Sequence, residues 1–435
     1  MNLYAKATKN IKYTFRVNCE IKHKMKQLLI IGYIWPEPAS SAAGSRMMQL
    51  IDLFLEKEYK ITYACPAKFS EYAVNLEEMG IEQVQIEANK SEFDSWLKKL
   101  NPEIVMFDRF MMEEQFGWRI AEQCPDALRI LDTEDLHFFR KARYEAAKNN
   151  RVLTKADLFS KEAKREIASI LRCDLTLIIS EAERDLLIEK FRIDRDLLLY
   201  IPFLVPQERI TESKSLKSFE EREHFLFIGN FLHDPNWDAV LYLKQYIWPL
   251  IRKELPKAEL HIYGAYATQK VDQLHNPKER FLIKGRAKEA LSTIENYKVL
   301  LAPLRFGAGI KGKFIDAMLT GTPSVTTTIG AEGICGIYPW NGEISNNDQE
   351  IAEAASMLYN REKRWLKAQQ NGFKIIQNRF QKESFSTNFF ETINRLEKQL
   401  SKHRQRNFIG AMLMHHTLQS TKYMSLWIEE KNKHT

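Results

Sequence analysis

A glycine- and lysine-rich loop between two apolar runs constrains this chain most. The apolar run Val299–Ala302 predicts a buried strand, and the next residues, Pro303–Lys313, contain three glycines and two lysines. A short helix then stops at Gly321, before a second strand at Ser324–Thr328. Glycine lets backbone N–H groups approach a ligand closely, and a helix N-terminus concentrates unpaired donors and partial positive charge. The loop therefore predicts an anion site that suits a diphosphate.

Two other phosphate-site patterns match the same loop in part. Gly307-x-x-x-x-Gly312-Lys313 is a P-loop up to its last position, where Phe314 replaces the Ser or Thr that would hold magnesium. The glycines also spell a dinucleotide fingerprint, with the acidic Glu332 about twenty residues on. Two residues separate the strand from the first glycine, however, and the unit lies far from the chain start. A P-loop or nicotinamide enzyme is therefore kept only as an alternative.

The segment resembles the nucleotide-sugar site of retaining glycosyltransferases of the large family 4 group, which have the GT-B fold. Asp316–Val325 corresponds to the pattern Glu-Ala-Met-x-x-Gly-x-Pro-x-Val of that family, and Pro303–Lys313 fits the lysine-containing donor loop of one branch. The resemblance covers roughly residues 27–400 and includes four further stretches: Phe227–Gly229, Asp234–Asn236, Gly330–Gly333 and the first loop Trp35–Gly44.

The resemblance implies an α/β architecture of GT-B type, with two doubly wound Rossmann-like domains and the active site in the cleft between them. Apolar runs that alternate with helical stretches agree with parallel sheets covered on both faces. The expected strands are Leu28–Tyr33, Ile61–Cys65, Ile104–Phe107, Ala127–Leu131, Leu175–Ile179 and Leu198–Ile201, followed by His224–Ile228, Glu259–Tyr263, Phe281–Ile283, Val299–Ala302 and Ser324–Thr328.

We expect the chain to be divided into five parts. Residues 1–26 form a basic N-terminal extension, and 27–205 form an acceptor-side domain. A polar linker, Gln207–Glu223, leads to a nucleotide-sugar-binding domain at 224–375. A helix at 376–400 then returns to the first domain, and 401–435 is a tail of unknown role for which a surface position is the simplest expectation.

Local patterns predict the apolar face of one helix and the first residues of two others. Met47, Leu50, Ile51, Phe54 and Leu55 share one helix face. The run Ser180–Glu183 has the spacing of a capping box. Asp234 followed by Pro235 predicts an N-cap with proline at the first helical position.

Composition predicts a soluble, cytoplasmic enzyme. The chain has 435 residues, of which 44% are hydrophobic and 28% charged, and it has no apolar run long enough for a membrane span. The first 26 residues lack the apolar core of a secretory signal. The five cysteines are scattered and form no CxxC pair, which favours a reducing compartment and disfavours a structural zinc site.

The net charge of +7 is concentrated in one helical region. Between Arg140 and Arg172 there are ten Lys or Arg residues against four Asp or Glu. No nucleic-acid motif accompanies them, so no nucleic-acid partner is expected. A solvated helix face is one interpretation, and peripheral contact with anionic membrane or a lipid-phosphate acceptor is the other. Because the donor loop belongs to the other domain, we expect that reversing Arg140, Lys141 and Arg143 to Glu would leave nucleotide binding intact.

The resemblance implies a role for each candidate residue. Lys311 would neutralise the leaving diphosphate and His137 would stand near the donor sugar, so these two are the catalytic candidates. The donor-binding candidates are Gly229, Asn236, Gly285, Arg286, Arg305, Gly307, Gly309, Ile310, Lys313, Asp316 and Glu332. The acceptor-binding candidates are Ser40, Ser41, Gly44, Arg46 and Arg109. No metal ligand and no cofactor are expected.

The expected activity is metal-independent transfer of a hexose, with retention, from a nucleotide sugar to a glycan or a lipid-linked acceptor. Two positions depart from the family pattern: Asp316 is one methylene shorter than the usual Glu, and Ala308 stands where many members carry a carboxylate. These departures leave an alternative open, a catalytically inactive nucleotide-sugar-binding subunit of a glycan-assembly complex.

Overall fold

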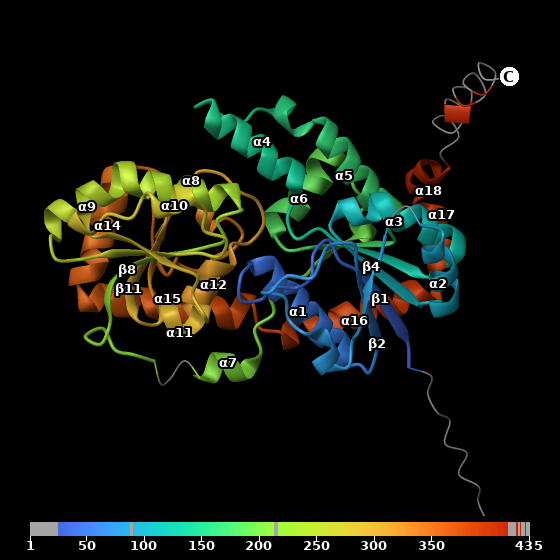
Figure 1. Cartoon of the computed structure of the whole chain (residues 1–435), viewed down its shortest axis with the longest axis horizontal. Helices are drawn as coiled ribbons and strands as arrows, with labels where there is room; N and C mark the ends of the chain where they lie inside the picture. Colours follow the sequence, from blue (N-terminus) through green and yellow to red (C-terminus); the bar gives the residue numbers. More distant parts are fainter. Residues whose placement is uncertain are drawn as a thin grey trace, which may run out of the picture.

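Two α/β domains lie side by side in the computed structural model of this chain (Figure 1). The structure describes residues 25–87, 90–212 and 216–415, together with positions 423, 424, 427 and 431. Nearly all of the expected N-terminal extension, 1–26, lies outside these residues. Across the described part of the chain, no helix combines the length and the apolar character that a membrane span requires.

The first domain is built on a seven-stranded parallel sheet with the order β3-β2-β1-β4-β5-β6-β7. Its strands are β1 (Gln27–Ile31), β2 (Lys60–Cys65), β3 (Glu82–Gln85), β4 (Ile104–Asp108), β5 (Leu128–Asp132), β6 (Leu175–Ile178) and β7 (Leu198–Tyr200). The six expected strands are present. The edge strand β3 was not predicted, because its sequence Glu-Gln-Val-Gln carries no apolar run.

Helices cover both faces of this sheet. They are α1 (Ala42–Leu55), η1 (Leu76–Met79), α2 (Glu92–Leu100), α3 (Phe110–Gln123), α4 (His137–Lys148), η2 (Lys155–Leu158), α5 (Lys161–Arg172), α6 (Glu181–Phe191) and η3 (Arg195–Leu197). In α1 the Ser41 hydroxyl accepts a hydrogen bond from Gly44 N at 3.0 Å and so caps the helix. The predicted apolar face of α1 is buried, including Leu50, Ile51 and Phe54.

The second domain contains a six-stranded parallel sheet with the order β10-β9-β8-β11-β12-β13. Its strands are β8 (Glu223–Ile228), β9 (Leu260–Tyr263), β10 (Phe281–Gly285), β11 (Tyr297–Ala302), β12 (Ser324–Thr326) and β13 (Gly342–Ile344). The short edge strand β13 escaped prediction, since only one of its three residues is a strongly apolar strand former.

The helices of the second domain are α7 (Gln207–Glu212), α8 (Asp234–Tyr242), the π-helical turn η5 (Leu243–Ile247), α9 (Trp248–Glu254), α10 (Gln269–Asp272), η6 (Pro277–Glu279), α11 (Ala290–Ile294), α12 (Gly312–Leu319), α13 (Thr328–Ala331), α14 (Asp348–Asn360) and α15 (Glu362–Arg379). The N-cap of α8 is His233, so the predicted start at Asp234 was one residue late. The expected linker begins with the short helix α7.

The strand order reverses between β1 and β4 in the first sheet and between β8 and β11 in the second. In open parallel sheets, ligands bind outside the carboxyl ends of the strands at such reversals. The loop after β1 leads into α1, and the loop after β11 is the glycine- and lysine-rich segment. The topology therefore places both predicted ligand loops at the reversal points of their sheets.

The end of the chain returns to the first domain through three helices: α16 (Glu383–Lys398), α17 (Leu400–Arg406) and α18 (Phe408–Met414). On α16, Phe389 and Ile393 belong to the same core cluster as Leu50 and Phe54 of α1. The rings of Phe54 and Phe389 lie 5.5 Å apart in an edge-to-face contact. Helix α16 thus completes one apolar face of the first domain (Figure 1).

Residues 400–414 form α17 and α18, which pack on the surface of the first domain. The buried His403 places Nε2 2.8 Å from the carbonyl oxygen of Asp174. The side-chain amide of Asn407 donates to the carbonyl of Leu171 at 2.6 Å. At Gly410 an added Cβ would lie 2.1 Å from that carbonyl, so glycine is what lets α18 approach α5.

Candidate active site between the two domains

The loop after β11 touches the first domain directly. Gly309 has a φ of +63°, and an added Cβ would lie 2.8 Å from the Cβ of Asp135. Its backbone N–H donates to Glu183 Oε1 at 2.9 Å. At Gly312, the first residue of α12, an added Cβ would lie 2.9 Å from that of Ala42, the first residue of α1. The N-termini of α1 and α12 therefore meet where the two domains contact each other.

Two lysines of this loop are partly buried beside the first turn of α12. The Lys311 ammonium donates to the carbonyl of Gly309 at 2.9 Å, and burial lowers the pKa of Lys311 to about 8 even though Glu332 opposes the shift. Burial, and then the charge of Lys311, lower the pKa of Lys313 to about 7. A bound anion would favour the protonated form of both lysines, so the pair is suited to hold one.

Gly229, Asn236 and Lys313 form one connected unit. An added Cβ at Gly229 would lie 2.7 Å from Cγ of Asn236, so glycine makes room for that amide at the end of β8. The amide donates to the carbonyl of Asn230 at 2.8 Å and accepts from the Lys313 ammonium at 2.6 Å. Lys313 also lies 4.5 Å above the ring of Phe227. The structure therefore brings three of the predicted donor residues together.

An arginine of the first domain, which the sequence analysis did not include among the site residues, contacts the donor loop. Arg143 of α4 donates to the Gly307 carbonyl at 2.8 Å and forms a two-bond pair with the Glu332 carboxylate, each bond 2.7 Å long. Although burial raises it, this arginine holds the pKa of Glu332 below its usual value. Arg143 of the basic segment therefore touches the donor loop, although that loop belongs to the other domain.

Most of the charge in that basic segment is paired. Its ion pairs are Arg140–Asp135, Lys141–Glu162, Arg143–Glu332, Arg151–Asp157, Arg165–Glu114 and Arg172–Glu113. Four of these acidic partners lie outside the segment. The count of charged residues between Arg140 and Arg172 therefore did not include them. Lys148, Lys155, Lys161 and Lys164 remain exposed to solvent.

His137 and Asp135 follow the carboxyl end of β5, and Asp135 lies beside Gly309 of the donor loop. His137 Nε2 lies 3.6 Å from Asp135 Oδ1, and burial lowers the pKa of His137 to about 3. The imidazole is therefore neutral near pH 7. Although burial alone raises it, the pKa of Asp135 is lowered to about 2 by Arg140 and His137. The first domain thus presents a neutral imidazole and an ionised carboxylate at the place where Gly309 approaches.

Glu183 is a second residue that the sequence analysis missed in this role. The run Ser180–Glu183 begins α6, but Ser180 makes no side-chain cap, so the predicted capping box is absent. Glu183 Oε1 instead accepts the backbone N–H groups of Leu136 and Gly309. Burial raises the pKa of Glu183 to about 7. A carboxyl group of the first domain thus anchors the loop beside Ala308, which is itself buried.

The remaining donor candidates are spread over the second domain. Gly285 ends β10 with a φ of +72°, and the next residue, Arg286, reaches the Ser40 hydroxyl at 3.3 Å. Ser40 and Arg286 therefore meet across the cleft. Asp316 lies on α12, where burial raises its pKa to about 7. Ile310 is buried in the core of the second domain.

The side chain of Arg305, a residue of the donor loop, turns toward α8. Its guanidinium is exposed and paired with Asp238 of α8, and it stacks 4.9 Å from the ring of Tyr242. The supporting contact of Arg305 with a diphosphate stays a prediction.

Among the acceptor candidates, Gly44 and Arg109 line one small cavity together with Asp108 and Glu134. Ser41 serves as the cap of α1.

The side chain of Arg46 is only 1% exposed and is enclosed by groups of the first domain, and its contact with an acceptor stays a prediction. Arg46 pairs with Asp132 at 3.0 Å and donates to the carbonyls of Ile201 and Pro202 at 2.7 and 3.1 Å. It holds α1 against the ends of β5 and β7.

Comparison with known proteins connects this geometry to a family. Residues 222–361 match the family described as Glycosyl transferases group 1. A protein of Klebsiella pneumoniae described as an uncharacterized 44.6 kDa protein in cps region is 27% identical over 175 residues. That alignment covers 38% of this chain and 45% of the relative, so the match spans less than half of the length of that protein.

Solved structures match over most of the chain. The glycosyltransferase of Rickettsia africae superposes with a TM-score of 0.62 at 12% identity, over 87% of this chain and all of that one. Sucrose-phosphate synthase of Thermosynechococcus elongatus gives 0.62 at 14% identity, with 85% and 99% covered. Anabaena HepE, solved with UDP and glucose, gives 0.61 at 12% identity, with 85% and 100% covered. The predicted GT-B fold is confirmed.

Proposed function

We propose that this chain, whose second domain matches group 1 glycosyltransferases on a GT-B frame, moves a hexose from a nucleotide sugar to a glycan or lipid-linked acceptor. The observation that carries the proposal is the meeting of the α1 and α12 N-termini at Ala42 and Gly312, with Lys311 and Lys313 beside it. Two helix N-termini and two desolvated lysines at one place form an anion site between two domains.

The leaving diphosphate would be held by fixed positive groups. As a nucleotide sugar is cleaved, negative charge develops on the phosphate oxygens, and donors already aimed at them lower the barrier. Lys311 is the N-cap residue of α12, so its ammonium and the first free N–H groups of that helix approach the same anion. Lys313, held by Asn236, adds a second cation two residues further along the chain.

The sugar and the acceptor would lie on the side of the first domain. The neutral imidazole of His137 can donate a hydrogen bond to a sugar hydroxyl without adding charge. The cavity lined by Gly44, Arg109 and Glu134 opens beside the same strand ends and suits an acceptor hydroxyl. The proposal includes retention of the anomeric configuration of the sugar, as the sequence resemblance implies. The binding of UDP and glucose by Anabaena HepE supports the donor class.

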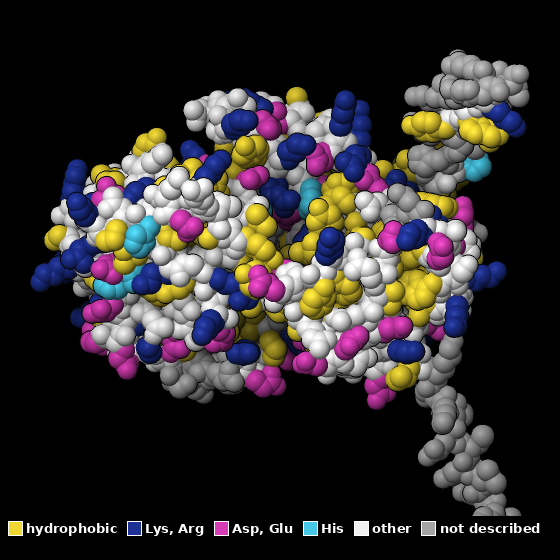
Figure 2. All heavy atoms as spheres, viewed as in Figure 1, with side chains coloured by type: hydrophobic (Ala, Val, Ile, Leu, Met, Phe, Trp, Pro, Cys, Tyr) yellow, Lys and Arg dark blue, Asp and Glu magenta, His cyan; other side chains and the backbone are white. Residues whose placement is uncertain are grey.

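We also propose a cytoplasmic location with peripheral contact to anionic membrane. The turn between α4 and α5 exposes Val152 at 84% and Phe159 at 53%, next to the solvent-exposed Lys148 and Lys155. Apolar side chains flanked by lysines are the composition that anionic lipid surfaces attract. Figure 2 shows several basic side chains over this upper edge.

A thermal-shift screen of the purified chain tests the donor class. UDP-glucose and other nucleotide sugars should raise the unfolding temperature in proportion to the logarithm of their concentration, because they bind only the folded state. ATP and NAD serve as the comparison. Equal stabilisation by ATP with magnesium would favour the P-loop alternative, and no stabilisation by any nucleotide sugar would contradict the proposal.

Chelation should leave the activity unchanged. The donor site offers lysines and backbone N–H groups to the diphosphate, so we expect turnover in excess EDTA to equal that with magnesium, at temperatures well below unfolding. The measurement is the initial rate of nucleoside diphosphate release. Complete loss of activity that magnesium restores would contradict this expectation and would indicate a metal-bridged diphosphate.

Arg143→Ala should weaken catalysis through the donor loop. The substitution removes the bidentate pair with Glu332 and the bond to the Gly307 carbonyl, and charged hydrogen bonds of this kind contribute about 1.5–3 kcal/mol. We expect kcat/KM to fall roughly tenfold or more. Lys141→Ala, on the exposed face of the same helix, is the matched control and should stay at the wild-type value. Equal rates for both variants would show that Arg143 has no part in the site.

A further inference from the structure

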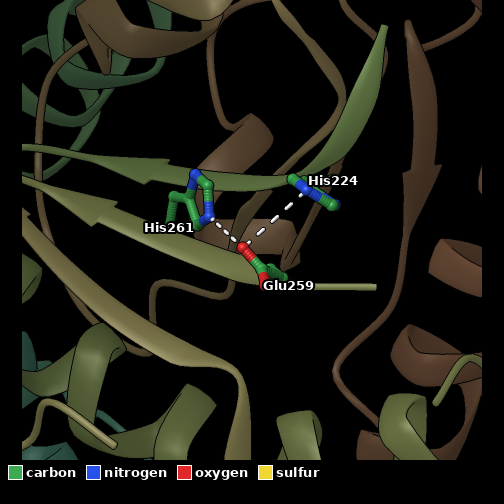
Figure 3. Close-up of side chains that lie close together, drawn as sticks. All are labelled: His224, Glu259 and His261. Carbon is green, nitrogen blue, oxygen red and sulfur yellow. Dashed lines mark hydrogen bonds and ion pairs between the residues drawn. The ribbon is translucent and has the colours of Figure 1, made fainter. Parts of the chain in front are cut away.

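Two histidines and a glutamate lie close together at the amino ends of β8 and β9, at the opposite end of the strands from the donor loop. His224 lies at the start of β8, Glu259 immediately precedes β9, and His261 is the second residue of β9. Because the sheet is parallel, the amino ends of its strands share one edge, whereas the donor loop follows the carboxyl end of β11. Figure 3 shows both imidazole rings directed toward the Glu259 carboxylate.

The three side chains are spaced as ligands of one small cation. One ligand atom from each lies within 4.8 Å of the others. His261 Nε2 is 2.9 Å from Glu259 Oε2, and His224 Nε2 is 3.8 Å from the same oxygen. Ligands in a tetrahedral zinc site, about 2.0–2.1 Å from the ion, stand roughly 3.3 Å apart. Small side-chain rotations would therefore bring the group to coordination distance.

Neighbouring groups orient two of the ligands. The other ring nitrogen of His261, Nδ1, lies 2.8 Å from the hydroxyl of Tyr297 on β11. With the proton on Nδ1, this bond leaves Nε2 free to bind a metal, as is usual for metal-bound histidine. Arg280 donates to Glu259 Oε1 at 3.1 Å and leaves Oε2 turned toward the histidines. The arrangement has the outer hydrogen bonds that hold a metal site in shape.

His224 itself is held in an unusual conformation. Its φ is +62°, in the left-handed region that a side chain other than Gly, Asn or Asp seldom adopts. Its Nδ1 is buried and has no hydrogen-bond partner. The ring nevertheless lies 5.2 Å from that of His261. A second carboxylate, that of Glu223, is 3.8 Å from His224 Nε2 and could supply a fourth ligand.

We propose that His224, Glu259 and His261 form a zinc site that fastens the amino ends of β8 and β9 together. Two imidazole nitrogens and one carboxylate oxygen are a ligand set that zinc prefers over magnesium or calcium. The site lies at the edge of the sheet away from the donor loop, so its role is structural and it does not enter the transfer reaction. The ligand side chains are between 10% and 26% exposed, so an ion can reach them from solvent.

The sequence had indicated no structural zinc site, because its cysteines form no CxxC pair. The proposal departs from that expectation. The spacing His224…Glu259-x-His261 matches no common zinc motif, and only the pairing of β8 with β9 brings its parts together. Glu259 and His261, two positions apart on an extended segment, share one face, which was the local signal available.

Zinc titration of the full-length, tag-free chain tests the proposal. The protein is stripped with EDTA and titrated with zinc chloride in competition with a chromophoric chelator. We expect one zinc ion per chain and a higher unfolding temperature with zinc, since the ion binds the folded state. Co²⁺ in place of zinc should give the intense visible bands of a four-coordinate site. Wild-type protein that binds no zinc, or that gives only the pale spectrum of six-coordinate Co²⁺, would overturn the proposal.

Variants assign the ligands. His261→Ala should weaken zinc binding at least tenfold, and Tyr297→Phe, which removes only the supporting hydroxyl, about tenfold. The chain carries a rival pair near its end, His415 and His416. Replacing both of these with Ala should leave the titration unchanged. If that control abolishes binding, or if the double variant His224→Ala/His261→Ala binds zinc as tightly as wild type, the site is not the one proposed.

Discussion

Lys311→Ala should lower kcat/KM by on the order of a hundredfold or more, which is the usual loss when a group that stabilises developing charge is removed. The lysine sits at the N-terminus of α12 with its ammonium 2.9 Å from the Gly309 carbonyl, beside the place where both domains meet. The neighbouring cations are already engaged, since Lys313 is held by Asn236 and Arg143 is paired with Glu332. The measurement is steady-state release of nucleoside diphosphate from a nucleotide sugar.

Lys288→Ala is the matched control for this variant, since Lys288 is an exposed lysine of the same domain. It should keep the wild-type rate. Nucleotide affinity should fall with Lys311→Ala, while the unfolding temperature should change little, because burial already disfavours the charged form of this lysine. Turnover by Lys311→Ala within a factor of two of wild type would rule out its assignment.

Arg46→Ala should lower the free energy of unfolding by about 3–5 kcal/mol, because it leaves a buried carboxylate without its partner. The Arg46 and Asp132 side chains are 1% and 0% exposed, and Arg46 also satisfies the carbonyls of Ile201 and Pro202. Urea denaturation, followed by circular dichroism, measures the change. The slope of the unfolding free energy against urea concentration should be the same for both proteins.

The exposed pair between Arg165 and Glu114 provides the comparison for this prediction. The side chain of Arg165 is 54% exposed, and exposed pairs contribute at most about 1 kcal/mol. Arg165→Ala should therefore stay within that range. A loss below about 1 kcal/mol for Arg46→Ala would contradict the structural role.

The sequence could predict the central strands and the donor loop because both have local patterns. Strands such as β1 and β11 are buried over most of their length and carry the apolar runs Leu28–Ile31 and Val299–Ala302. The donor loop combines glycine and lysine in a short span that follows such a strand. The short edge strands β3 and β13 bury little surface, so their sequences carried no comparable signal.

The errors concern contacts between residues that are far apart in the sequence. Glu183 has the spacing of a capping box, but its carboxylate accepts a hydrogen bond from the backbone N–H of Gly309 instead. Arg143 was counted as part of a surface charge cluster, although its partner Glu332 is 189 residues further on. Arg46 looked like a cleft residue because only the folded chain shows that Asp132 and the carbonyls of Ile201 and Pro202 enclose its side chain. Such pairings are fixed by the arrangement of the domains and not by local pattern.

Donor hydrolysis in the absence of acceptor is the most direct test of the central claim, that this cleft activates a nucleotide sugar. The purified chain is incubated with a panel of nucleotide sugars, starting with UDP-glucose, and the release of nucleoside diphosphate and free sugar is followed over hours. We predict slow hydrolysis of one donor, unaffected by EDTA and lost in Lys311→Ala. A donor that stabilises the protein but is never cleaved, even at high enzyme concentration, would contradict catalysis and would identify the chain as a nucleotide-sugar-binding subunit.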